Sequence, residues 1–387
     1  MEDNPAAPDV IASPRSAGYT PVMTELIAPH YTGRRVAVGL SGGTDSAVAA
    51  LLLKQAGADV VALTMHLVSD GHGLDAEPQL DRARRIAERL GVPHHVVDFT
   101  ERFDQAIVQR FVDAYAAGQT PSPCCRCNPI VKFGFLLDAA RSMGCDSLAT
   151  GHYVRLLEDP AGERRIGRGL DSNKDQTYFL FGLTQRQLQC ACFPLGGWYK
   201  ARVKRLAADQ ALVVDAVSES QDLCFVKDDD YASLVACRRP DLAVPGTIVD
   251  REGNALGRHD GFFRYTIGQR QGLGLGGGPW YVTALRPERN EVVVGREEDL
   301  YSRSVRIGHL NWQAGGAIAE SATDSDVQFR YRMKPVHVSR ARMLDGGDVV
   351  VDLSTPVRGV APGQAAVFYE EDCVLGGGWI KGTMNEK

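Results

Sequence analysis

The sequence lacks the features of membrane, secreted and broadly nucleic-acid-coating proteins. None of its apolar runs approaches the about 20 residues that cross a bilayer. The first 33 residues contain neither a signal-peptide core nor an Arg-rich transit pattern. With 43 Lys and Arg against 48 Asp and Glu, the chain has no excess of positive charge, so nucleic-acid contact needs a local basic surface. We therefore expect a cytoplasmic protein that does not contact a membrane.

The sequence also lacks the even cysteine framework of a small disulfide-rich domain. Nine cysteines in 387 residues favour a reducing compartment, where clustered cysteines are usually catalytic or metal-binding. The length exceeds what one hydrophobic core usually supports, so two or three domains are expected. No pattern indicates an oligomer, and we expect a monomer.

The strongest chemical signal is a glycine-rich turn at residues 39–46. An apolar segment at 36–38, typical of a buried strand, precedes it, and a stretch with helical propensity at 47–54 follows. A glycine-rich turn between a strand and a helix binds anions, because the free N–H groups at the helix start point at the ligand. The Walker A lysine is absent. The predicted nucleotide-binding residues are Gly39, Leu40, Ser41, Gly42, Gly43, Thr44, Asp45 and Ser46.

Strand and helix patterns alternate from residue 34 to about residue 155. The patterns predict strands at 59–67, 94–99 and 147–150 and helices at 79–90 and 133–143. Such alternation indicates an α/β domain with a parallel sheet and helices on both faces. Ligands of these sheets bind beyond the carboxyl ends of the strands, where Met65, Gly151 and His152 fall. We expect Met65 and Gly151 to join the nucleotide site.

Three cysteines lie within four residues in the proline-rich segment 120–129, which we expect to be a rigid loop. The Cys124-x-x-Cys127 spacing fits a redox pair, a metal clip, or a nucleophile with a neighbour. Arg126, together with a helix expected to start just after the cysteines, would favour a thiolate.

The last two-fifths of the chain have a β texture. The G-x-G-x-x-G spacing at 272–277 is not a dinucleotide fingerprint, because no apolar strand precedes it and no helix follows. Residues 327–343 contain five Lys or Arg and no acid, which favours local phosphate steering. Period-two alternation predicts a small antiparallel barrel from strands at 327–333, 336–343, 348–353, 364–369 and 373–380.

Ten motifs in order resemble one family. Besides SGGTDS they are TPSPCCRCN, ATGHY, DSNKDQTYFL, FPLG, SQDLCFV, YTIGQRQGLG, RYR, APGQ and VLGGGWI. The chain is similar over residues 34–381 to the tRNA-specific 2-thiouridylases of the MnmA type, within the PP-loop ATP pyrophosphatases. The resemblance implies a PP-loop domain, a small central β module and a C-terminal β-barrel. It also implies that ATP, with Mg²⁺ on its phosphates, adenylates the C2 oxygen of the wobble uridine in tRNAs for Lys, Glu and Gln, which sulfur then replaces.

The resemblance assigns the sulfur chemistry to two cysteines. Cys127 would be the nucleophile and Cys224 would carry a persulfide, supplied by a sulfur-relay protein or a cysteine desulfurase. Many members have Asp where this chain has Cys124. The resulting set of Cys124, Cys127 and Cys224 resembles that of related thiolases with a [4Fe-4S] cluster, and this alternative stays open beside the persulfide. Cys125 is expected to be a bystander, and the remaining cysteines are expected to be buried: Cys145, Cys190, Cys192, Cys237 and Cys373.

The resemblance also implies tRNA contacts. They comprise Ser122, Pro123, Cys124, His152, Lys174, Asp175, Gln176, Arg330, Tyr331 and Gln364. The expected domains are an extension at 1–33, a PP-loop domain with a helical tRNA-binding part at 34–240, a β module at 241–298 and a barrel at 299–387.

Two other functions compete with thiolation. An amidating PP-loop ligase would need a glutaminase segment, which we do not find. A non-catalytic, metal-containing RNA-binding protein would leave the loop at 39–46 without a purpose.

Overall fold

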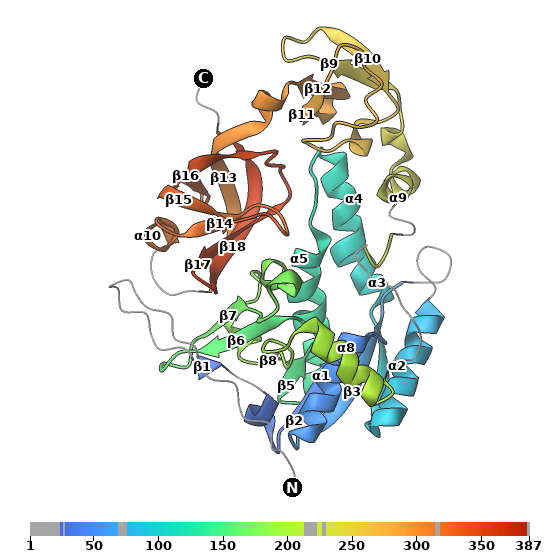
Figure 1. Cartoon of the computed structure of the whole chain (residues 1–387). Coiled ribbons are helices and arrows are strands. Elements are labelled where there is room, and N and C mark those ends of the chain that lie inside the picture. The colour runs from blue at the N-terminus through green and yellow to red at the C-terminus, as the bar shows by residue number, and fades with distance from the viewer. Residues whose placement is uncertain are drawn as a thin grey trace.

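The computed structural model describes residues 24–25, 28–68, 76–212, 223–226, 230–313 and 318–384. Figure 1 shows an α/β domain at the bottom, a small β module at the top and a β-barrel at the upper left. No helix in these ranges is long and apolar enough to cross a membrane. The expected extension at 1–33 lies mostly outside the described residues.

The first domain is built on a five-stranded, fully parallel sheet with the order β4-β3-β2-β5-β8. Central strand β2 is buried on both faces, since Val36, Ala37 and Val38 are inaccessible to solvent. This explains its continuous apolar run. The predicted parallel sheet is thus confirmed. The strands are β2 (Arg35–Gly39), β3 (Asp59–His66), β4 (His94–Asp98), β5 (Ser147–Ala149) and β8 (Ala191–Cys192).

Helices cover both faces of this sheet. One face packs against α1 (Thr44–Gln55), α2 (Ala76–Leu90) and α8 (Lys200–Asp209). The other face packs against two long helical segments. The first comprises α3 (Thr100–Phe103), η2 (Asp104–Val108) and α4 (Gln109–Ala116), and the second α5 (Pro123–Cys127), η3 (Asn128–Leu136) and α6 (Leu137–Ser142).

The cysteine-rich segment is helical, so the expectation of a rigid loop is wrong for its second half. Helix α5 starts at Pro123, where the fixed φ of proline suits the first helical turn. It passes directly into η3, a stretch of π-helix. Such wide turns occur frequently at functional sites.

The central module is a four-stranded sheet with the order β10-β9-β12-β11. Its strands are β9 (Gly246–Val249), β10 (Ala255–His259), β11 (Tyr281–Arg286) and β12 (Glu291–Gly295). Helix α9 (Tyr231–Arg238) leads into it and packs beside α4. Residues 272–277 lie in an irregular connection between β10 and β11, in keeping with the rejection of a dinucleotide fingerprint.

The C-terminal strands close into an antiparallel barrel, as predicted, because β18 pairs with both β13 and β17. One expected strand is shorter, since β14 ends at Gln328 and Arg332 has a left-handed backbone (φ +64°). The strands are β13 (Tyr301–Trp312), β14 (Asp326–Gln328), β15 (Val336–Met343), β16 (Val349–Arg358), β17 (Ala365–Glu370) and β18 (Cys373–Thr383).

An unpredicted hairpin joins the first domain to the barrel. Its strands are β6 (Val154–Glu158) and β7 (Arg164–Arg168), and β7 pairs with β18. The short strand β1 (Thr24–Glu25) extends the same sheet at β6. Helix α5 therefore lies where the first domain meets the barrel (Figure 1).

Candidate active site

The glycine-rich turn follows strand β2, whose neighbours are β3 on one side and β5 on the other. This reversal of strand order is where open α/β sheets bind their ligands. Gly151 follows β5 and lies against the first turn of α1. A Cβ on Gly151 would stand 2.8 Å from the Asp45 carbonyl carbon and 2.8 Å from the Ser46 nitrogen. The ends of β2 and β5 therefore lie side by side, and their assignment to one nucleotide site stays a prediction.

Hydrogen bonds within the turn fix its shape. Ser46 Oγ accepts from the Ser41 N–H at 3.1 Å and donates to the Gly43 carbonyl at 3.0 Å. Gly42 has φ +73°, and a Cβ there would lie 2.8 Å from the Gln79 carbonyl, so only glycine fits. Gly43 is the N-cap of α1 and offers no side-chain cap. The first N–H groups of α1 are therefore available to an anion.

Asp45 is held by two side chains from other elements. Its Oδ1 accepts from the Tyr153 hydroxyl at 2.7 Å, and Lys200 Nζ lies 2.8 Å from Oδ1 and 2.7 Å from Oδ2. Lys200 is the first residue of α8, and its own N–H donates to Asp171 at 3.0 Å. Lys200 was not predicted, because one lysine in an amphipathic helix carries no motif.

The other predicted nucleotide-binding residues lie within or at the ends of the strands and of α1. Leu40 is buried and prolongs the pairing of β2 with β3 through its N–H bond to the Leu63 carbonyl at 2.8 Å. Met65 is partly buried at the end of β3, and Thr44 is partly exposed at the start of α1. Gly39 ends β2.

The structure brings together the three cysteines that the sequence singles out. Cys124 and Cys127 lie on α5, and Cys224 lies in the short described segment 223–226. The thiols of Cys124 and Cys127 both raise the pKa of Cys224 through their charge, which places them within electrostatic range of it. All three thiols are free.

The surrounding protein, not a neighbouring arginine, dominates the ionisation of these thiols. Desolvation by the surrounding protein raises the pKa of Cys127 to about 11, that of Cys224 to about 12 and that of Cys124 above its ordinary value, although the side chains of Cys124 and Cys224 reach solvent. The expectation that Arg126 favours a thiolate is therefore wrong. Arg126 instead lies over the Trp379 ring, 4.8 Å from its centroid.

Lys132 on η3 supplies the positive charge at this site. It opposes the effect of burial and lowers the pKa of each of the three thiols. Its Nζ lies 3.4 Å from Nε2 of His152, whose Nδ1 lies 2.6 Å from Thr150 Oγ1. Burial and Lys132 hold the pKa of His152 well below its ordinary value, so His152 is neutral. Lys132 was not predicted as a site residue.

The cysteines do not have the arrangement of a metal site. Across the described ranges, no group of three or more His, Cys, Asp or Glu side chains could hold a metal ion. Cys124, Cys127 and Cys224 all belong to those ranges. The expected alternative of a [4Fe-4S] cluster on these three thiols therefore finds no support in their geometry.

Several predicted tRNA contacts hold parts of the protein together. Asp175 pairs with Arg168 at 2.7 Å, and Gln176 Oε1 accepts from the Tyr153 N–H at 2.9 Å. Gln364 Nε2 donates to the Thr120 carbonyl at 3.1 Å, which ties the barrel to the segment before α5.

The remaining predicted tRNA contacts surround α5 and the barrel. Tyr331 packs on Phe179 with ring centroids 4.5 Å apart, and Arg330 donates to the Arg358 carbonyl at 3.2 Å. Ser122 Oγ lies 3.2 Å from Cys125 Sγ. Pro123 and His152 are buried, whereas Cys124 is exposed and Lys174 is partly exposed.

The other cysteines only partly match expectation. Cys125, Cys145 and Cys192 are buried. Cys237 is exposed because it faces outward from α9, and Cys190 and Cys373 are partly exposed.

Comparison of the chain with known proteins identifies its family. Three family models match in order: a tRNA methyl transferase HUP domain over residues 34–228, a tRNA methyl transferase PRC-barrel domain over 238–296, and an aminomethyltransferase beta-barrel domain over 302–380.

Curated relatives match nearly the whole chain. The tRNA-specific 2-thiouridylase MnmA of Geotalea uraniireducens (strain Rf4) is 43% identical over 365 residues, which cover 92% of this chain and 96% of that protein. The tRNA-specific 2-thiouridylase MnmA of Paramagnetospirillum magneticum (strain ATCC 700264 / AMB-1) is 45% identical over 360 residues, covering 89% and 95%.

Similarity to solved structures is weaker. The U34-tRNA thiolase NcsA from Methanococcus maripaludis, solved with its [4Fe-4S] cluster, matches 55% of this chain and 67% of its own at 20% identity. Its TM-score of 0.34 is too low to transfer a cofactor or an activity. The relatives of more than 40% identity decide the family. The chain belongs to the MnmA family of tRNA-specific 2-thiouridylases.

Proposed function

We propose that this protein is a tRNA-modifying transferase that uses ATP to replace the C2 oxygen of the wobble uridine by sulfur. One observation carries the proposal: residues 151–152 link the two halves of the chemistry. Gly151 packs against the nucleotide turn at Asp45, and His152 lies 3.4 Å from Lys132, the cation that acts on the three thiols. Adenylation of the C2 oxygen and delivery of sulfur to the C2 carbon can therefore occur on one carbonyl group of the substrate.

Activation comes first, because oxide is a poor leaving group. The C2 oxygen of the uridine attacks the α-phosphorus of ATP, the bond to the β-phosphate oxygen breaks, and pyrophosphate leaves. The uncapped first turn of α1 stabilises negative charge on the phosphates. The Asp45–Lys200 pair fixes that turn against α8.

Sulfur transfer follows in balanced steps. A donor persulfide passes its outer sulfur to the Cys224 thiolate, which makes a Cys224 persulfide and leaves the donor as a thiolate. The Cys127 thiolate attacks the inner sulfur, so the persulfide S–S bond breaks, hydrosulfide leaves and a Cys127–Cys224 disulfide forms. Hydrosulfide adds to the adenylated carbon and AMP departs. A dithiol reductant supplies two electrons and reopens the disulfide.

Lys132 promotes ionisation of these thiols to the nucleophilic thiolates. Their raised pKa values leave few thiolates at neutral pH, and the nearby ammonium group of Lys132 increases that fraction. Neutral His152 accepts a hydrogen bond from Lys132 and adds no competing positive charge.

Magnesium fits this site as a counter-ion of ATP and not as a resident metal. Asp45 is the sole carboxylate of the turn, and both its oxygens lie against Lys200. Mg²⁺ commonly binds through substrate phosphates with few protein ligands. It would lower the negative charge that the phosphates present to the turn.

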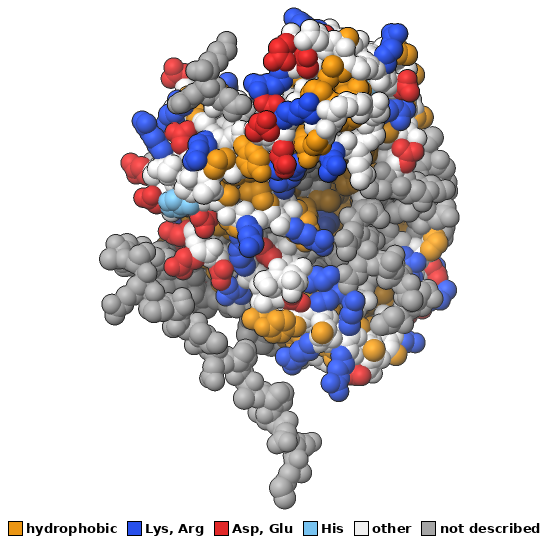
Figure 2. Space-filling model, turned by 45° about the horizontal axis from the view of Figure 1, so that its top comes forward, with side chains coloured by type: hydrophobic (Ala, Val, Ile, Leu, Met, Phe, Trp, Pro, Cys, Tyr) orange, Lys and Arg blue, Asp and Glu red, His pale blue; other side chains and the backbone are white. Residues whose placement is uncertain are grey.

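The proposed partners are tRNA and a sulfur donor protein. On the face drawn in Figure 2, Lys and Arg side chains lie through the middle and lower part, although the whole chain has a net charge of −5. Such a local basic surface steers nucleic acid onto an otherwise acidic protein. The tRNA contacts inferred for Lys174, Arg330 and Tyr331 belong to this proposal.

Methyl transfer is the alternative reaction, because two of the matching family models are named as tRNA methyl transferase domains. Methyl transfer needs neither ATP cleavage at the α-phosphate nor paired thiols, so the site favours sulfur transfer. The test is AMP and pyrophosphate release with wobble-uridine tRNA and with the same tRNA carrying cytidine at the wobble position. The proposal expects AMP only with uridine, and equal AMP formation from both would overturn it.

A further inference from the structure

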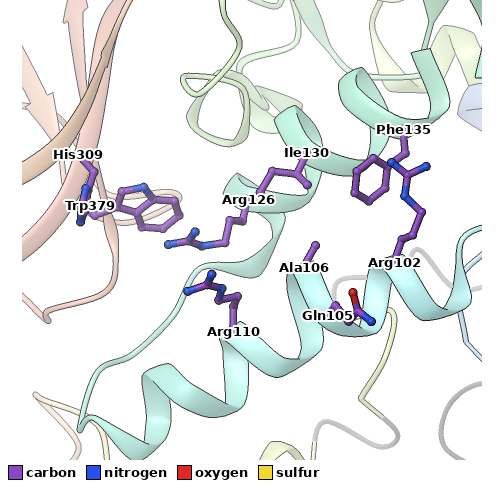
Figure 3. Close-up of a pocket in the computed structure, with 9 residues that line it drawn as sticks. All are labelled: Arg102, Gln105, Ala106, Arg110, Arg126, Ile130, Phe135, His309 and Trp379. Atoms are coloured by element: carbon purple, nitrogen blue, oxygen red, sulfur yellow. The ribbon is translucent and has the colours of Figure 1, made fainter. Parts of the chain in front are cut away.

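A pocket of about 630 Å³ lies where the first domain meets the barrel (Figure 3). Side chains from α3 to α4, from α5 and η3, and from barrel strands β13 and β18 form its walls. Its volume falls within the about 300–1,000 Å³ of ordinary ligand sites. Neither the nucleotide turn nor the three thiols use it.

The pocket is positively charged and lacks a counter-ion. Its lining includes Arg102, Arg110, Arg126 and His309 but no Asp or Glu. Within the described chain, the three arginines form no ion pair and donate no side-chain hydrogen bond. A group of unpaired guanidinium ions held together by the fold favours binding of an anion.

Aromatic rings orient two of these arginines without using their N–H groups. The guanidinium of Arg126 lies 4.8 Å from the Trp379 ring centroid, and that of Arg102 lies 3.7 Å from the Phe135 centroid. Contact with a ring face leaves the five N–H donors free for an oxyanion. Figure 3 shows Arg110 and Arg126 extending toward one another from two helices. Burial and the charge of Arg110 lower the pKa of Arg126, as expected for converging like charges.

The pocket adjoins the reactive thiols. Arg126 directly precedes Cys127 on α5, and Ile130, one turn later on the continuous helix, also lines the pocket. Adjacent helix positions are about 100° apart. A ligand that contacts Arg126 and a substrate atom that contacts Cys127 therefore lie on neighbouring faces of the same helix.

We infer that this pocket binds a phosphodiester of the tRNA strand next to the reactive uridine, with Trp379 beside the adjoining nucleoside. The inference rests on the proposed function, which supplies the RNA. Arginine matches phosphate oxygens with two parallel N–H groups, and an aromatic wall accommodates a base or ribose of any sequence. The site would hold the strand in register without reading its sequence.

The test measures binding of a fluorescent anticodon stem–loop RNA against salt concentration. The variants are Arg110→Gln, an exposed position safe for folding, and the double variant Arg110→Gln/Arg126→Gln. Arg205→Gln on α8 is the matched control, because its side chain is 85% exposed and α8 packs on the opposite face of the sheet from the helices that line the pocket. Each lost phosphate contact should reduce the slope of log affinity against log salt by roughly 0.7. Reduced slopes in both pocket variants, with the control at the wild-type value, are expected.

Unchanged slopes in both pocket variants would overturn the inference, provided that the wild type binds the RNA. A wild type that binds no RNA would instead overturn the proposed function. Inorganic pyrophosphate is the second probe. If RNA occupies the pocket, pyrophosphate should compete with RNA more strongly in the wild type than in the double variant at equal occupancy of RNA. Pyrophosphate binding that the double variant loses, but that does not displace RNA from the wild type, would assign the pocket to a small free anion and contradict the assignment to the strand. A stem–loop with a neutral methylphosphonate beside the wobble uridine should bind the wild type as weakly as the double variant binds unmodified RNA.

Discussion

The ammonium group of Lys200 lies 2.7 Å from Oδ2 and 2.8 Å from Oδ1 of Asp45, so a helix that follows the parallel sheet in sequence neutralises the carboxylate of the nucleotide turn. The Lys200 side chain is 11% exposed and the Asp45 side chain 32%. The burial of this pair is therefore intermediate between that of an exposed and that of a fully buried salt bridge. Loss of Lys200 would leave an unpaired negative charge beside the proposed site of the ATP phosphates.

We predict that Lys200→Met impairs the use of ATP. Removal of one partner costs about 1 kcal/mol in exposed pairs and about 3 kcal/mol in buried pairs, so kcat/KM for AMP formation should fall roughly 5- to 150-fold. Arg205→Met on the same helix is the control and should retain wild-type kinetics. An unimpaired Lys200→Met enzyme would show that the pair does not support the turn.

Gly151→Ala should abolish nucleotide binding with little loss of global stability. The new Cβ would stand 2.8 Å from backbone atoms of Asp45 and Ser46, which must shift and displace the first turn of α1. Calorimetric titration with ATP checks the prediction. Gly276→Ala is the matched control and should bind ATP like the wild type, because a Cβ at Gly276 meets nothing within 4 Å. Equal ATP affinity in the two variants would argue against this packing.

Lys132→Met should make Cys127 less reactive. The pKa of Cys127 is about 11, and the Lys132 cation lowers it, so removal of the cation raises it further. Below the pKa, the thiolate fraction falls about tenfold for each unit of increase. Alkylation of Cys127, followed by peptide mass spectrometry from pH 7 to 10, should slow in Lys132→Met and stay near wild type in Lys132→Arg. Equal rates in wild type and Lys132→Met would remove Lys132 from the mechanism.

His152 should make the protein sensitive to acid. Its folded-state pKa lies well below the about 6.5 of an unfolded chain, so the unfolded state binds more protons between these values. The free energy of unfolding therefore decreases as the pH falls below about 6.5. Urea midpoints at pH 7.5 and pH 5.5 should differ less in His152→Gln than in wild type. His337→Gln, at a side chain 48% exposed, should keep the full difference. An unchanged pH dependence in His152→Gln would contradict a buried neutral imidazole.

Sequence patterns predicted the parallel sheet and the barrel, because the buried residues of their strands are either consecutive or alternate with exposed ones. The apolar run of β2 and the alternation of β15 (Val336–Met343) led directly to the parallel sheet and the barrel. Hairpin β6–β7 escaped prediction because β7 carries the polar sequence of Arg164–Arg168 and pairs with a strand about 200 residues later. Helix α5 escaped prediction because the prolines and cysteines of residues 120–129 are typical of a loop.

Residues of the candidate site could be proposed from sequence where a motif spans several residues, but not where a single side chain acts from a distant segment. The nucleotide turn and the Cys127 and Cys224 thiols have local signatures. Lys132 and Lys200 have none, because a lysine in a helix gains its role from what the fold places beside it. The orientation of Arg126 toward Trp379, instead of toward Cys127, depends on helix phase and domain packing.

The most direct test of the sulfur-transfer proposal is nucleoside mass spectrometry of digested wobble-uridine tRNA after incubation with iron-free enzyme, ATP, a persulfide donor and a dithiol. Wild type and Cys124→Ala should produce 2-thiouridine. Cys224→Ser should release AMP in a tRNA-dependent manner without forming it. If only iron-loaded enzyme produces 2-thiouridine, or if Cys224→Ser thiolates the tRNA as fast as wild type, the persulfide mechanism is wrong.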